Sequence, residues 1–93
     1  MYRVYNNQPY ECYRETVAIF DTDEEAMLFI YIHNYYENYY YENGEDLWLS
    51  HGEVCNIMKE NKFTIEDAIK ARDENRSSFF DKYNFECLNN YRW

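Results

Sequence analysis

The stretch that decides the fold is TDEEAMLFIYIH, residues 22–33. Thr22 at an N-cap with Glu25 three residues later is the capping-box pattern, in which each side chain satisfies a free backbone N–H of the other residue. Asp23 and Glu24 add favourable negative charge to the first turn. Helical spacing then predicts one buried face, made of Ala26, Phe29, Ile30 and His33. The sequence therefore predicts a helix from about Asp23 to about Tyr40, which Asn43-Gly44 ends.

The residues before this helix predict a β-hairpin. Residues 1–5 alternate and favour a strand, and residues 10–20 are rich in aromatic and β-branched side chains. Between them, Asn6-Asn7-Gln8-Pro9 is a turn signal, because Asn tolerates the left-handed conformation and Pro fixes φ. We expect the two strands to pair antiparallel.

The residues after the helix predict one more strand and further helices. Residues 46–50 (Asp-Leu-Trp-Leu-Ser) are short and apolar and predict a third strand. Ser50 and Glu53 form a second capping box, and Thr64 with Asp67 resembles a third, with Phe63 and Ala68 at the two staple positions. Ser77 or Ser78 is expected to cap a last helix, whose apolar residues are spaced by about one turn: Phe79, Phe80, Tyr83 and Cys87.

The predicted class is α+β in a single domain over residues 1–93. A small three-stranded antiparallel sheet (β-β-α-β) is followed by a C-terminal helical segment of two or three helices. The length of 93 residues suits one core, and 46% hydrophobic residues are enough to fill it.

The composition also argues against several classes of function. A net charge of −9 argues against direct binding to nucleic acid or to an anionic membrane, since both need a basic patch. No apolar run is long enough to cross a bilayer, and the N-terminus lacks the apolar core of a signal peptide. Three cysteines without a CxxC pair fit reduced thiols, and hence a cytoplasmic protein.

Negative charge is concentrated in residues 15–58, which contain no Lys or Arg. All the excess negative charge of the chain comes from this segment, which holds ten acids: Glu15, Asp21, Asp23, Glu24, Glu25, Glu37, Glu42, Glu45, Asp46 and Glu53. One interpretation is that these acids cap helices and keep the surface soluble. The other is an acidic surface for a basic partner, which would speed encounter and select that partner.

Tyrosine is concentrated in residues 31–41, where six of eleven positions are Tyr. A domain of this size cannot bury all six rings, so some lie on a half-buried helix flank or face a partner or a second copy. Aromatic rings beside carboxylates suit arginine, which stacks on the ring and pairs with the acid. With no base nearby in sequence, we predict a partner-binding patch made of Tyr35, Tyr36, Glu37, Tyr39, Tyr40, Glu42, Glu45 and Asp46.

Catalytic and metal-binding patterns are missing from the sequence. His51 and Cys55 are spaced i, i+4, but His33, Cys12 and Cys87 are isolated, and nothing has zinc-finger spacing. The motifs GxSxG, GxxxxGK[ST] and GxGxxG do not occur. We therefore expect no metal, no cofactor and no enzymatic activity.

In size, acidity and composition, the whole chain resembles the small early proteins of phages and mobile elements, among them anti-CRISPR and other anti-defence inhibitors. The resemblance carries over no site residue. It implies a non-enzymatic protein that blocks or modulates a basic, nucleic-acid-handling partner, with acids in place of phosphates and tyrosines in place of stacked bases. The alternative is a homo-oligomeric structural or accessory protein that uses the tyrosine-rich helix as its self-interface.

Overall fold

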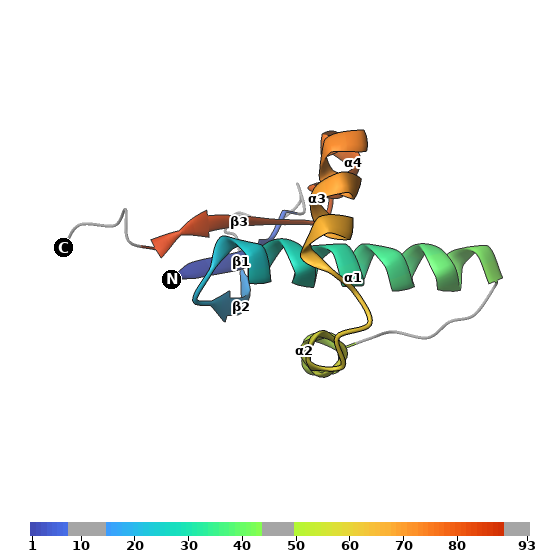
Figure 1. Ribbon diagram of the computed structural model, residues 1–93. Coiled ribbons are helices and arrows are strands. Elements are labelled where there is room, and N and C mark those ends of the chain that lie inside the picture. The colour runs from blue at the N-terminus through green and yellow to red at the C-terminus, as the bar shows by residue number, and fades with distance from the viewer. Residues whose placement is uncertain (8–14, 44–49, 89–93) are drawn as a thin grey trace.

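The computed structural model describes residues 1–7, 15–43 and 50–88, and within residues 38–43 it describes the backbone alone. Three strands and four helices occur in these ranges (Figure 1): β1 (Tyr2–Asn6), β2 (Thr16–Phe20), α1 (Asp23–Asn43), α2 (His51–Lys59), α3 (Ile65–Glu74), α4 (Arg76–Phe79) and β3 (Tyr83–Cys87). The strands form one antiparallel sheet. The predicted α+β class with a three-stranded antiparallel sheet is confirmed.

Strand β1 is the centre of the sheet, in the order β2-β1-β3. Val4 lies opposite Ala18 of β2 and Phe85 of β3, and the β1–β2 register shifts between Val4 and Tyr5. Arg3 ties all three strands together, because it forms an ion pair with Glu86 and donates a hydrogen bond to Thr16 Oγ1 at 2.6 Å. The predicted pairing of the two N-terminal strands is confirmed, and residues 8–14 of their connection lie outside the described residues.

The third strand comes from a different part of the chain than predicted. Of the predicted strand 46–50, residues 46–49 lie outside the described residues and Ser50 is the N-cap of α2. The helix predicted through Tyr83 and Cys87 is wrong, since these residues bound β3. The predicted cap at Ser77 or Ser78 is also wrong, because Asn75 Oδ1 accepts from Ser78 N at 3.1 Å and begins the four-residue α4.

The physical reason is that two periods coexist in the C-terminal segment. Phe79, Tyr83 and Cys87 repeat every four residues, as in a helix, but Tyr83, Phe85 and Cys87 also alternate, as in a strand. The second edge of β1 offers a full ladder of backbone hydrogen bonds to the alternating pattern. Pairing with β1 therefore decides the structure, and local spacing does not.

The three predicted helix starts are confirmed at the level of hydrogen bonds. Thr22 Oγ1 accepts from Glu25 N at 3.2 Å and donates to Glu25 Oε1 at 3.0 Å. Ser50 makes the same two contacts with Glu53, both at 3.2 Å. Thr64 Oγ1 accepts from Asp67 N at 3.2 Å. Helix α1 ends at Asn43, slightly beyond the predicted Tyr40.

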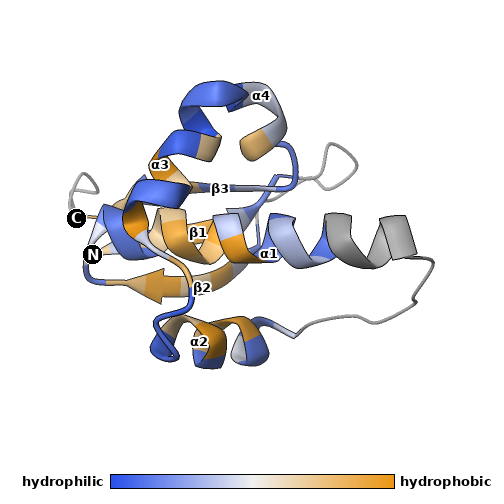
Figure 2. Ribbon diagram, turned by 45° about the vertical axis from the view of Figure 1, so that its right-hand side comes forward, coloured by the Kyte–Doolittle hydropathy of each residue, from blue (hydrophilic) through white to orange (hydrophobic). Residues whose placement is uncertain are grey.

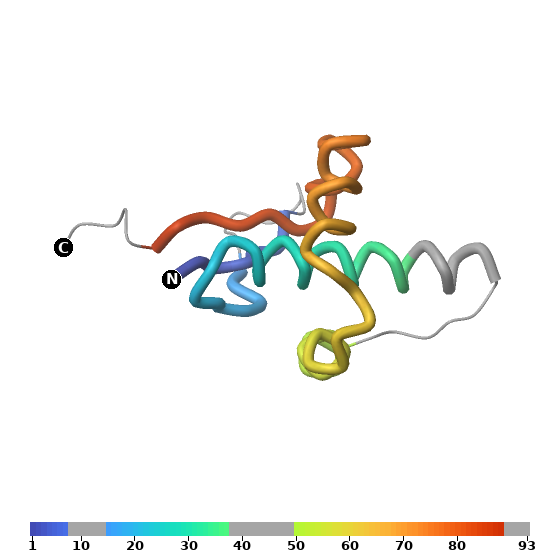
Figure 3. Tube along the Cα trace, viewed as in Figure 1, coloured from blue at the N-terminus to red at the C-terminus, as the bar shows by residue number. Residues whose placement is uncertain are grey.

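Helix α1 is the element around which the others pack. It contacts all three strands and the other three helices. Helix α2 lies on one side of α1, and α3 with α4 lies on the other (Figures 1 and 3). The strand β2 and the first half of α1 are mainly apolar, whereas α3 and α4 carry many hydrophilic residues (Figure 2).

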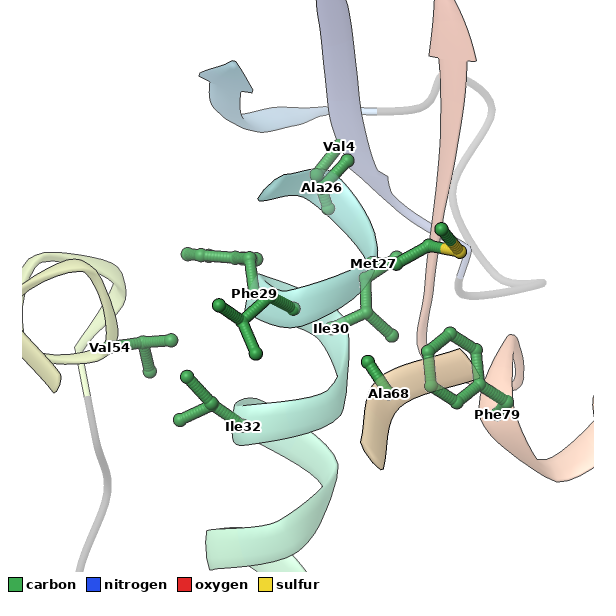
Figure 4. Close-up of a cluster of buried hydrophobic side chains, with 10 residues drawn as sticks. Val4, Ala26, Met27, Phe29, Ile30, Ile32, Val54, Ala68 and Phe79 are labelled. Carbon is green, nitrogen blue, oxygen red and sulfur yellow. The ribbon is translucent and has the colours of Figure 1, made fainter. Parts of the chain in front are cut away.

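The core runs along α1 and reaches into each neighbouring element (Figure 4). Val4 of β1 lies against Ala26, and Val54 of α2 faces Phe29 and Ile32. On the other side of α1, Ala68 of α3 and Phe79 of α4 approach Ile30. The predicted inward residues of α1 are buried, His33 included.

Candidate partner-binding surface on α1

Three tyrosines of α1 surround Phe63, which lies between α2 and α3. The ring centroids of Tyr31, Tyr35 and Tyr36 lie 5.8, 5.1 and 6.0 Å from that of Phe63. Tyr31 and Tyr36 are half-buried, whereas Tyr35 is 46% exposed. Edge-to-face contacts of this kind hold the connection between α2 and α3 against α1. Part of the tyrosine cluster is therefore structural, and Tyr35 is the ring most open to solvent.

A groove of about 300 Å³ opens between α1 and the corner where α3 meets α4. Tyr31 and Tyr35 form one wall with α1, and Ala71 and Phe79 form apolar parts of the other. Six polar residues complete the lining: Asn34, Glu37, Asn75, Ser78, Asp81 and Lys82. The Nδ2 atom of Asn34 donates to the backbone oxygen of Phe79 at 2.9 Å, which fixes the corner against α1.

The lining of this groove carries charge of both signs. Glu37 forms an ion pair with Lys82, and the two side chains are 41% and 43% exposed. No base lies near the tyrosines in the sequence, but the fold brings Lys82, the residue before β3, to Glu37. An ion pair as exposed as this one contributes about 0–1 kcal/mol, so a stronger partner for Glu37 can replace Lys82 at small cost.

The predicted partner-binding residues fall into three groups. Tyr35, Tyr36 and Glu37 lie together on α1, and the rings of Tyr35 and Tyr36 are 5.3 Å apart. The next group belongs to α1, but its side chains lie outside the described part: Tyr39, Tyr40 and Glu42. Glu45 and Asp46 lie outside the described residues altogether. The patch stays a prediction, supported by the position of its first three members.

A contact between two histidines is a feature that the sequence analysis missed. His33 Nε2 lies 3.1 Å from His51 Nδ1, the first residue of α2. The His33 ring also packs 4.8 Å from Phe29 and 4.9 Å from Tyr83 of β3. Burial, followed by the charges of His51 and Lys82, lowers the pKa of His33 to about 4.

His33, which has no neighbouring histidine in the sequence, therefore has one in the fold. Its place on the buried face of α1 was readable from the helical spacing. Its contact with His51 was not, because eighteen residues separate the two along the chain. The contact depends on how α2 docks against α1.

Other reactive groups are few in the described part of the chain. Among residues 1–7, 15–37 and 50–88, no three His, Cys, Asp or Glu side chains converge as metal ligands would. Cys55 and Cys87 are half-buried free thiols, and burial raises the pKa of Cys55. Cys12 lies outside the described residues, so the redox state of all three remains a prediction. No described helix combines the length and apolarity that a bilayer crossing requires.

No protein family, curated protein or solved structure matches this chain.

Proposed function

We propose that the chain is a non-enzymatic binding protein that blocks or modulates a basic, nucleic-acid-handling partner. The contact surface is the tyrosine-rich and acidic part of α1, and the setting is phage anti-defence or host takeover, in the cytoplasm. The chain would occupy the site of the nucleic acid on its partner, with carboxylates in the positions of phosphates.

One observation carries this proposal: the half-exposed Tyr35 ring lies in the wall of a groove that also holds Glu37 and Asp81. A guanidinium group can stack on a tyrosine face and form a two-point contact with a carboxylate. Glu37 is already engaged by the ammonium of Lys82, which an arginine fork can replace. The groove therefore has the chemistry to receive an arginine from a basic surface.

The sequence supports the same kind of partner over a larger area. Residues 15–58 carry ten acids and no base, as noted above. A surface of one sign attracts the opposite sign over about one Debye length, roughly 8 Å at physiological salt. Association would then be fast and sensitive to salt, while the aromatic contacts would set how long the complex lasts.

The test is affinity capture from a bacterial lysate with the wild-type chain and with a Tyr35→Ala, Glu37→Lys double variant. We expect the wild type to retain a basic protein that DNA or RNA releases in competition, and the variant to lose it. Glu66→Lys on the exposed face of α3 is the matched control, because it makes the same charge change outside the groove. Equal capture by wild type and double variant, or capture that nucleic acid does not affect, would contradict the proposal.

Self-association through the tyrosine-rich helix is the alternative function. Light scattering of the purified chain separates the two. A dimer that persists at high salt and shields the Tyr35 ring would favour the alternative, because aromatic self-contacts do not depend on charge. A monomer at the same concentration favours a foreign partner.

A further inference from the structure

Strand β2 forms one edge of the sheet, and within the described residues its only hydrogen-bonded neighbour is β1. Its sequence, TVAIF, has no charged residue and no proline. Natural edge strands are commonly protected by Lys, Pro, a bulge or a cover, because an unprotected edge pairs with other strands. Of these features, the described part of β2 shows only the register shift opposite Val4 and Tyr5. Ile19, the fourth residue of this strand, is 51% exposed.

The other edge of the sheet differs from β2. Strand β3 carries Glu86, which is held in an ion pair with Arg3, and all five of its residues are half-buried. In β2, by contrast, Thr16 and Ile19 are exposed. Of the two edge strands, β2, which precedes α1 in the chain, is therefore the less protected one.

The ends of β2 are acidic. Glu15 and Asp21, both exposed, flank the strand, and Asp23 and Glu24 follow at the start of α1. Residues 14–25 hold five acids and one base in total: Glu15, Asp21, Asp23, Glu24, Glu25 and Arg14. An incoming strand would meet an apolar centre with negative charge at both ends.

This charge pattern disfavours a second copy of the chain. An antiparallel pair of β2 strands centred on Ala18 places Glu15 opposite Asp21 of the other copy, and a parallel pair places each acid beside itself. Like charges directly opposite one another destabilise strand pairing. A strand with basic residues at both ends replaces this repulsion with attraction.

We propose that the outer edge of β2 binds an extended segment of a protein partner by strand addition, and that this segment has Lys or Arg on both sides of a β-branched centre. The basic character of the partner rests on the proposed function, whereas the position of the contact rests on the sheet. The main-chain hydrogen bonds supply the contact and the flanking acids select the segment.

The experiment titrates the 15N-labelled chain with the peptide acetyl-Lys-Thr-Val-Thr-Val-Thr-Lys-amide, whose two Lys are six residues apart like Glu15 and Asp21, and follows amide shifts and hydrogen exchange. We expect shifts at residues 16–20 and slower exchange of the β2 amides that point away from β1. A peptide with Glu at both Lys positions should bind about tenfold more weakly. The variant Glu15→Lys with Asp21→Lys should reverse that preference. Glu60→Lys with Glu74→Lys, at the end of α2 and in α3, makes the same charge change outside the sheet and should behave as wild type.

A peptide with N-methylated backbone amides separates strand addition from simple charge attraction. Equal binding of this peptide, or shifts spread over the acids of α1 without change in β2, would overturn the proposal. Self-pairing of β2 that excludes the peptide would overturn it as well. Failure here is distinct from failure of the proposed function, since a partner could still be captured through the groove by the Glu15→Lys, Asp21→Lys variant.

Discussion

His33 lies where three elements meet, and its protonation state is linked to their packing. Its ring contacts Phe29 of α1, His51 of α2 and Tyr83 of β3, and the positive charge of Lys82 also acts on it. All of these favour the neutral imidazole, since burial and nearby positive charge both penalise the cation.

The first prediction concerns pH. The pKa of His33 is about 4 in the folded chain and about 6.5 when unfolded, so the unfolded state takes up the proton first as pH falls. The contribution of the neutral His33 ring to the free energy of unfolding is fully present above pH 6.5 and is lost as pH falls towards 4. Between pH 7 and 4.5 we expect about 1–2 kcal/mol more loss in wild type than in His33→Gln. Urea unfolding of both proteins measures this, and parallel pH profiles would contradict it.

A second prediction at the residue scale concerns the helix caps. Thr22→Ala and Ser50→Ala each remove a hydroxyl that accepts from a backbone N–H of the first turn. Each should lower the free energy of unfolding by about 0.5–2 kcal/mol. Ser77→Ala is a control, because Ser77 caps no described helix. Unchanged urea midpoints for both cap variants would show that these hydrogen bonds do not matter for stability.

At the scale of elements, the sequence predicted correctly those helices and strands whose stabilising contacts lie close together along the chain. Helix α1 was readable because its cap, its first-turn acids and its buried face all occur within one stretch of chain. The pairing of β1 with β2 was readable for a similar reason. The strand β3 was not, because its partner β1 lies about eighty residues earlier and only the assembled sheet selects the alternating pattern. The Lys82 contact with Glu37 escaped prediction for the same reason.

The third prediction tests β3. Phe85 lies opposite Val4 and its ring contacts Tyr2 and Phe80, with centroids 6.1 Å away in each case. Phe85→Ala should cost about 1–3 kcal/mol, less than for a fully buried ring, because Phe85 is half-buried. Asn84→Ala, its neighbour in β3, should cost less. Equal stability of Phe85→Ala and wild type in urea would mean that this strand is not packed as described.

At the scale of the whole molecule, the acidic side chains and the exposed aromatic ring are expected to act at different stages of binding. The acids spread from the edge of β2 along α1, whereas the half-exposed Tyr35 lies at one groove. Charge acts during approach and is screened by salt, and a stacked ring acts only once contact is made. The acids are therefore expected to change the association rate constant, and Tyr35 the dissociation rate constant.

The most direct measurement is the binding kinetics of the captured basic partner at two salt concentrations, with a thermal melt of each variant. Glu42→Lys with Asp46→Lys should slow association and flatten its salt dependence. Tyr35→Ala should leave association nearly unchanged and lower the melting temperature only modestly, because its ring packs on Phe63 but is half-exposed. It should speed dissociation, with a loss of binding free energy of about 2 kcal/mol or more if the ring is an anchor. The account is contradicted if charge reversal leaves association at low salt unchanged, or if Tyr35→Ala weakens binding only in proportion to lost folding.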